Sequence, residues 1–214
     1  MTAWRAFPDG LEAFHGVRRE SAGLVASALG DWLAGLAVRM PFAAVVALEE
    51  MGAPRGVINA LLVRGDLARA RVTIGKGGLF DFDDGGAPAL LLAVREAGEV
   101  IDVCAVQSAR PDEWALLRGE GLVLGHRALL RCVLGIDDVL PVFGTPLAWL
   151  VAGGAGICVL DWAPSVLGQL RGLGPGVTLH CEDARAADVL GRALAWDGLP
   201  KVAVRPADEE RMAA

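Results

Sequence analysis

The chain has 214 residues, of which 54% are hydrophobic and 21% charged; this is enough apolar material for a folded core and excludes a disordered protein. The net charge is −6, but residues 1–79 carry 9 basic and 7 acidic side chains, whereas residues 80–214 carry 11 and 19. Because phosphate binding needs clustered Lys and Arg, the acidic part is not expected to bind nucleic acid by charge alone.

The sequence carries no targeting or paired-cysteine signature. Its first ten residues lack the apolar stretch of a secretory signal, and Asp31 and Arg39 interrupt the most apolar segment, residues 22–40. We therefore expect a cytoplasmic protein that does not associate with membranes. The four cysteines are too far apart to supply the paired ligands of a zinc site, and we expect no cofactor: Cys104, Cys132, Cys158 and Cys181.

Residues 1–70 are predicted to form a helical region. After an irregular start, apolar side chains recur at helical spacing in three segments that end at Pro or Gly: about 20–39, 41–52 and 55–64. Pro41 and Pro54 suit the starts of the second and third helices, because a residue in the first turn needs no N–H donor.

The helices are followed by a predicted two-stranded ribbon, Arg71–Asp83, with a glycine-rich turn in its middle. Three helices and a ribbon follow the order of a winged helix-turn-helix. In this interpretation six side chains contact DNA: Arg55, Asn59 and Arg64 from the third helix, and Arg69, Arg71 and Lys76 beyond it. It requires the three helical side chains to be exposed and turned away from Glu49 and Glu50. The alternative is a helical subdomain that packs on a sheet.

Residues 71–140 are predicted to be mainly antiparallel β structure. Short apolar or alternating runs predict strands at 71–74, 79–83, 89–94, 100–107, 114–117 and 121–124. The third and fourth of these flank Arg95–Glu99, where Gly98 supplies the turn of a hairpin.

Residues 141–206 are predicted to form a small α/β unit, followed by a frayed tail at 207–214. Strands are expected at 157–160, 177–181 and 201–205, with helices near 147–153, 164–171 and 184–195. Strands that alternate with helices imply right-handed crossovers and parallel pairing, and we expect these three strands to be neighbours.

Acidic residues follow two of these strands. Asp161 comes after the first, and Glu182 and Asp183 come after the second. On adjacent strands these carboxylates would meet at one sheet edge, where they could hold Mg²⁺ and assist phosphodiester chemistry. Trp162 and His180 would then line the pocket. The simpler alternative is helix capping, by Glu182 or Asp183 for the last helix and by Asp161 for the helix that starts near 164.

The repeated strand–acid–helix order resembles the Toprim module of primases and topoisomerases. In that family a Glu ends the first strand and an Asp-x-Asp follows a later one, and together they bind Mg²⁺. The segment His180–Leu194 resembles the later strand with its helix, and Asp161 stands where the Glu is expected. This chain has adjacent Glu182 and Asp183 instead of Asp-x-Asp. The run Gly154–Trp162 is similar to uncharacterised alphaproteobacterial proteins of prophage or mobile-element type.

These patterns predict an α+β protein with a helical front, an antiparallel middle and an α/β end. The function we expect is that of a non-catalytic accessory or interaction protein of a bacterial mobile element, with DNA or a replication or mobile-element protein as partner. One alternative is a Mg²⁺-dependent phosphodiester enzyme of degenerate Toprim type. Another is a structural module that forms homo-oligomers.

Overall fold

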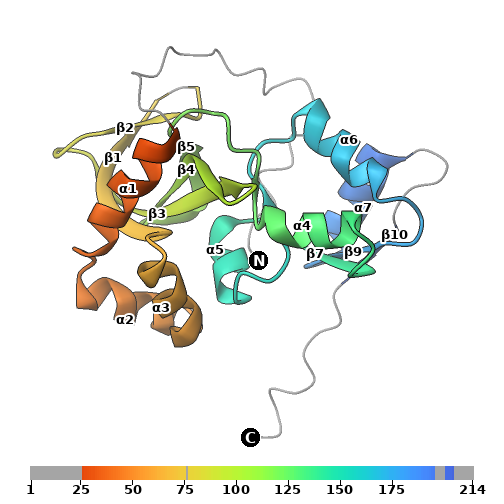
Figure 1. The fold of residues 1–214 in the computed structure, drawn as a ribbon, viewed down its shortest axis with the longest axis horizontal. Coiled ribbons are helices and arrows are strands. Elements are labelled where there is room, and N and C mark those ends of the chain that lie inside the picture. The colour runs from red at the N-terminus through yellow and green to blue at the C-terminus, as the bar shows by residue number, and fades with distance from the viewer. Residues whose placement is uncertain (1–25, 76, 196–200, 205–214) are drawn as a thin grey trace, which may run out of the picture.

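The computed structural model describes residues 26–75, 77–195 and 201–204, and its fold is α+β (Figure 1). The described helices are α1 (Ala26–Ala37), α2 (Phe42–Glu50), α3 (Arg55–Val63), α4 (His126–Val133), α5 (Pro146–Val151), α6 (Pro164–Gly172) and α7 (Ala184–Leu194). The start of the first predicted helix, the predicted phosphate contact Lys76 and the tail at 207–214 lie outside the described residues.

The first sheet is antiparallel and has the strand order β2-β1-β3-β4-β5. Its strands are β1 (Leu67–Ile74), β2 (Phe80–Phe82), β3 (Ala87–Glu96), β4 (Glu99–Gln107) and β5 (Arg110–Leu116). The predicted hairpin joins β3 to β4 through Ala97 and Gly98, whose φ angles are 49° and 92°. Positive φ at both turn residues matches the right-handed twist of the strands.

The second sheet has the order β10-β9-β7-β8-β6, in which β6 is antiparallel to β8 and the other pairs are parallel. Its strands are β6 (Val123–Leu124), β7 (Val139–Phe143), β8 (Ile157–Val159), β9 (Thr178–Cys181) and β10 (Lys201–Val204). The expectation that β8 and β9 are neighbours is wrong, because β7, which the sequence did not reveal, lies between them.

The helices and the two sheets form layers that pack together through three buried apolar clusters. Helix α1 covers one face of the first sheet, and Leu29, Leu33 and Leu91 belong to the same buried cluster. The other face of that sheet meets α2, α3, α5 and one face of the second sheet in a cluster that contains Leu92, Leu150 and Cys158. Residues of α4, α6 and α7 cover the remaining face of the second sheet. The front and the back of the chain therefore share a central core.

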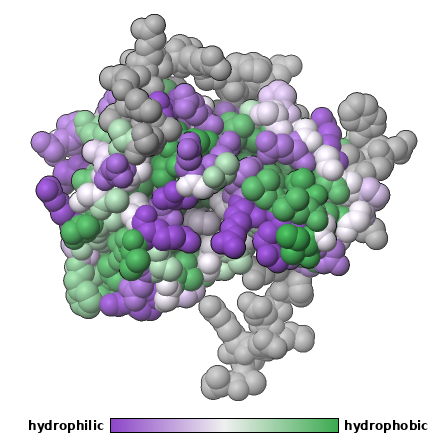
Figure 2. Space-filling model, in the orientation of Figure 1, coloured by the Kyte–Doolittle hydropathy of each residue, from purple (hydrophilic) through white to green (hydrophobic). Residues whose placement is uncertain are grey.

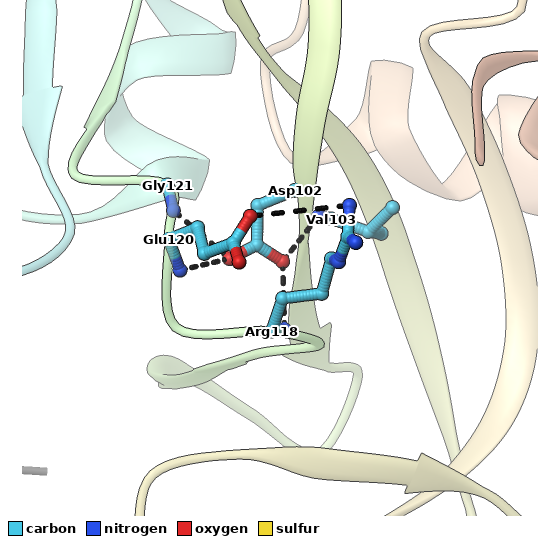
Figure 3. Close-up of polar contacts among 5 residues, drawn as sticks. All are labelled: Asp102, Val103, Arg118, Glu120 and Gly121. Carbon is cyan, nitrogen blue, oxygen red and sulfur yellow. Dashed lines mark hydrogen bonds and ion pairs between the residues drawn. The ribbon is translucent and has the colours of Figure 1, made fainter. Parts of the chain in front are cut away.

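The buried carboxylate of Asp102, on β4, holds the segment that leads from one sheet to the other (Figure 3). Its Oδ1 accepts hydrogen bonds from the backbone N–H groups of Val103 at 2.7 Å and Arg118 at 2.9 Å. Its Oδ2 accepts from Glu120 at 2.8 Å and Gly121 at 2.9 Å. A buried charge is costly unless it is well bonded, so these donors are what make Asp102 tolerable here.

The predicted ribbon is not a separate two-stranded wing, because β1 pairs with β3 from Leu67 to Val72 as well as with β2. The winged helix-turn-helix interpretation is thus not confirmed. Within the described residues no single helix is long and apolar enough to cross a membrane. One pair, Ala28–Ala37 and Phe42–Glu50, meets this test jointly on length and composition, and it is bent by 90°.

Candidate functional site

The carboxyl ends of β7 and β9 lie at the position where an open α/β sheet usually places its ligands, and we call this position the crevice. The chain leaves β7 toward β8 on one side and then crosses to β9 on the other side, so the strand order reverses at this point. Such a reversal is where ligand sites of open parallel sheets occur. Gly144 and Thr145 follow β7, and Glu182 and Asp183 follow β9.

Two of the predicted metal ligands are hydrogen-bonded to backbone N–H groups in this crevice. Glu182 Oε2 accepts from the N–H of Gly144 at 3.0 Å and so joins the two strand ends. Asp183 is the N-cap of α7, and its Oδ1 accepts from the N–H of Ala186 at 2.7 Å. The capping alternative is therefore confirmed for Asp183.

Asp161, the third predicted ligand, comes from the far side of β7. The axes of β8 and β9 are two strand spacings apart, or about 10 Å. In the described part of the chain no three His, Cys, Asp or Glu side chains form a group that could hold a metal ion. The expectation that Asp161 caps α6 is wrong, because Ala163 occupies the N-cap position without a side-chain bond.

Trp162 and His180 occupy ordinary packing positions. Trp162 is half-buried against the cluster on the outer face of the second sheet. His180 lies within β9, opposite Pro141 and Ala203. Neither side chain lines the 840 Å³ cavity described below.

Beside the crevice, the Cys181 thiol is buried. Burial raises its pKa to about 12, and the nearby carboxylates of Asp183 and Glu182 act in the same direction. The thiol is therefore protonated at neutral pH and is a poor nucleophile or metal ligand.

The residues predicted to contact DNA are divided in the structure. Arg55 is turned toward Glu49 in an ion pair and lies over the ring of Phe42, 5.6 Å from its centroid. Arg64 Nε pairs with Asp66 Oδ2 at 2.9 Å, while Asn59 is exposed. The helix-based DNA interpretation requires Arg55 to be turned away from Glu49, and the ion pair between them does not meet this requirement.

Arg69 and Arg71 remain exposed on β1. Because side chains two residues apart in a strand share a face, both lie on one side of the first sheet. Of the predicted DNA contacts, these two arginines are exposed on the same face and could therefore reach a phosphate backbone together.

An exposed apolar patch on α4, the loop to β7 and the first residue of β7 is a candidate interaction surface that the sequence did not reveal. It consists of large apolar side chains at least 39% exposed: Leu130, Val133, Leu134, Ile136 and Val139. Figure 2 shows a cluster of hydrophobic residues over α4 and β7. Such clusters on a folded surface commonly mark contacts with other proteins. We call these five residues the α4 patch.

The structure thus offers three candidate features. They are the acidic crevice, whose carboxylates accept hydrogen bonds from the chain's own backbone, the exposed pair Arg69 and Arg71, and the α4 patch. No protein family, curated protein or solved structure was found to match this chain.

Proposed function

We propose that this chain is a non-catalytic accessory or interaction protein. One observation carries the proposal: at the crevice between β7 and β9, the carboxylate of Glu182 accepts a hydrogen bond from the chain's own Gly144 N–H. The group that would hold a metal ion or activate water in an enzyme of this architecture is used here to join two strand ends.

The energetics favour this structural role. A hydrogen bond to a charged group contributes about 1.5–3 kcal/mol, and less where solvent reaches it. Recruiting Glu182 and Asp183 as Mg²⁺ ligands would weaken the bond to Gly144 and the cap of α7. Asp161, across β7, would also have to approach them.

The test is a calorimetric titration with Mg²⁺ and Mn²⁺, together with a phosphodiester cleavage assay on single- and double-stranded DNA. We expect neither metal binding at this edge nor cleavage. Metal-dependent cleavage that disappears in Glu182→Gln and Asp161→Asn would instead establish the enzyme alternative.

A second candidate function, the oligomeric module, is supported by the α4 patch. Arg131 and Asp137 form a two-point ion pair there, with Nε–Oδ2 at 2.6 Å and Nη2–Oδ1 at 2.8 Å. These opposite charges neutralise each other at the patch, so two copies of the chain could meet there without strong repulsion and form a symmetric dimer.

Light scattering after size exclusion tests the dimer. We expect a concentration-dependent dimer that Leu134→Glu abolishes. Val63→Glu is the matched control, because Val63 is 88% exposed on α3 and Leu134 is 72% exposed on the patch. A monomer at all concentrations, or equal effects of both variants, would rule out the patch as a dimer interface.

We propose DNA as one partner, bound through the exposed side chains of Arg69 and Arg71. A mobility-shift assay at 50 and 200 mM salt should show a complex that weakens as salt rises, because phosphate contacts release counterions. Replacing both arginines by Gln should remove the complex, whereas Arg185→Gln on α7 should not.

A further inference from the structure

A cavity of about 840 Å³ is lined by Gly153 and Gly154, which precede β8, so it lies at the amino end of that strand and at the opposite edge of the second sheet from Glu182. Its walls come from α3, the β3–β4 hairpin, the first turn of α4 and the end of α5. Gly125, the N-cap of α4, also lines the cavity and is next to Leu124, the residue paired with Cys158 on β8. The volume falls within the range of about 300–1,000 Å³ that is usual for small-ligand pockets.

The lining is rich in cationic side chains. Arg64, Arg95 and Arg127 line the cavity together with His126, and among the described residues Asp66 is the one carboxylate in its lining. The formal charge is therefore +2 when the histidine is neutral. Figure 2 shows hydrophilic side chains around a hollow near the middle of the visible face. A pocket of this charge favours anions, in a chain that is acidic overall.

Asp66 holds two of the arginines in place. It is 5% exposed; its Oδ2 forms an ion pair with Arg64 Nε at 2.9 Å, and its Oδ1 accepts a hydrogen bond from Arg95 Nε at 2.7 Å. Its backbone is fixed as well, since its carbonyl accepts from the N–H of Ala93 at 2.9 Å. Anchored guanidinium groups lose less entropy when they bind phosphate, and each retains N–H donors beyond Nε.

Arg127 adds a third cation, from α4. It is exposed, and among the residues that the structure describes it has no hydrogen-bond or ion-pair partner. The cavity also has an apolar wall, which includes Trp149, Leu92 and Val57. Trp149 is fixed by a bond of 3.0 Å from its Nε1 to the carbonyl of Gly156.

We propose that this cavity binds an organic phosphate of nucleotide size. The phosphates lie between Arg64, Arg95 and Arg127, and the ring system lies against the wall formed by Val57 and Trp149. Cationic groups from the end of α3, from β3 and from α4 fit more than one phosphate oxygen, and the apolar wall fits the part of the ligand that carries no charge. The cavity shares Leu130 with the α4 patch, but binding of a phosphate there does not depend on the proposed interaction function.

The test measures binding of ATP to the full chain by calorimetry, with inorganic phosphate and adenosine as partial ligands. ATP should bind at least about tenfold more tightly than either, and its affinity should fall as salt rises. A 5′-phosphorylated dinucleotide compared with its 5′-hydroxyl form distinguishes a free nucleotide from the phosphorylated end of a nucleic acid. If adenosine binds as tightly as ATP, or if ATP does not bind at millimolar concentration, the proposal is wrong.

Two variants locate the site without disturbing the Asp66 pairs. Arg127→Gln removes an exposed cation and should weaken ATP binding about tenfold or more, which corresponds to the loss of one charge-assisted contact of about 1.4 kcal/mol. Ala60→Glu places a carboxylate on the α3 wall and should weaken ATP binding further. Arg185→Gln is the matched control and should leave the affinity unchanged. Equal effects of Arg127→Gln and Arg185→Gln would refute the assignment.

Discussion

Asp102 and Glu182 both place a carboxylate against backbone N–H groups, but in different surroundings. Asp102 is buried between the two sheets and accepts from four donors on two segments. Glu182 is an exposed residue whose carboxylate accepts from Gly144. An unsatisfied polar group costs far more free energy when it is buried than when it is exposed. We therefore expect the hydrogen bonds to Asp102 to stabilise the whole fold, and the hydrogen bond to Glu182 to order only the two strand ends that it joins.

The largest expected effect is that of Asp102→Ala. The variant leaves four N–H donors without their acceptor in a buried joint, and we expect a loss of at least about 3 kcal/mol in the free energy of unfolding. Urea unfolding followed by circular dichroism measures it. Asp84→Ala, at an exposed position, is the control and should change stability by less than about 0.5 kcal/mol. Similar losses in both variants would contradict the role of Asp102.

Gly121→Ala should have the next largest effect. An added Cβ would lie 2.7 Å from Asp102 Cβ and 2.8 Å from Val94 Cγ1, so the loop or the strand has to move. Overpacking of this kind costs about 1–3 kcal/mol. The matched control is Gly168→Ala in α6, where a Cβ meets nothing within 4 Å and helix propensity should increase. If Gly121→Ala is as stable as the wild type, the close packing of Gly121 against Asp102 and Val94 does not contribute to stability.

Stability should fall at alkaline pH because of the buried thiols. Burial raises the pKa of Cys181 from an ordinary value near 9.0 to about 12, so the folded state keeps a proton that the unfolded chain loses. Stability from this group is complete below about pH 9 and is lost as the pH rises toward 12. Cys181→Ala should reduce the slope of unfolding free energy against pH between 8 and 11. An unchanged slope would exclude Cys181 as its source.

Asp183→Ala tests the cap of α7. Loss of an N-cap side chain costs about 1 kcal/mol, so the melting temperature should fall by a few degrees. Asp183→Asn is the control and should be close to neutral, because Asn caps a helix about as well. A loss of equal size in the Asn variant would point to the charge of Asp183 rather than to its hydrogen bond.

The smallest effect is expected for Glu182→Ala. Its bond to Gly144 is only partly buried, so water can replace the lost acceptor, and we expect a loss of less than about 1 kcal/mol. Amide exchange of Gly144 should nevertheless speed up. A loss as large as that of Asp102→Ala would remove the contrast between the two carboxylates.

Local signals in the sequence predicted most of the secondary structure. The proline at the start of α2 and of α3, and Gly98 in the hairpin, act within a few residues, so their effects can be read without a partner. Strand β7 was missed because it contains Pro141, and proline argues against a central strand. The structure accommodates it beside Gly156, where a Cβ would lie 2.4 Å from the Pro141 carbonyl oxygen.

The candidate site was less predictable because it depends on strand order. Asp161 and Glu182 each follow a strand as expected, but whether the strands are neighbours is decided by β7. The bond between Glu182 and Gly144 spans 38 residues. The α4 patch had a local signal, with apolar residues on both sides of Gly135, but a core helix would give the same pattern.

Because helices α2, α3 and α5 and both sheets share one buried cluster, neither sheet is expected to fold without the other. A chain cut after Gly121 would expose Leu92 and Cys104 on one product, and Leu150 and Cys158 on the other, because each sheet uses the other to cover an inner face. Neither product would retain a complete core. We therefore expect both sheets to unfold in a single cooperative transition, and expression of either part alone to give insoluble protein.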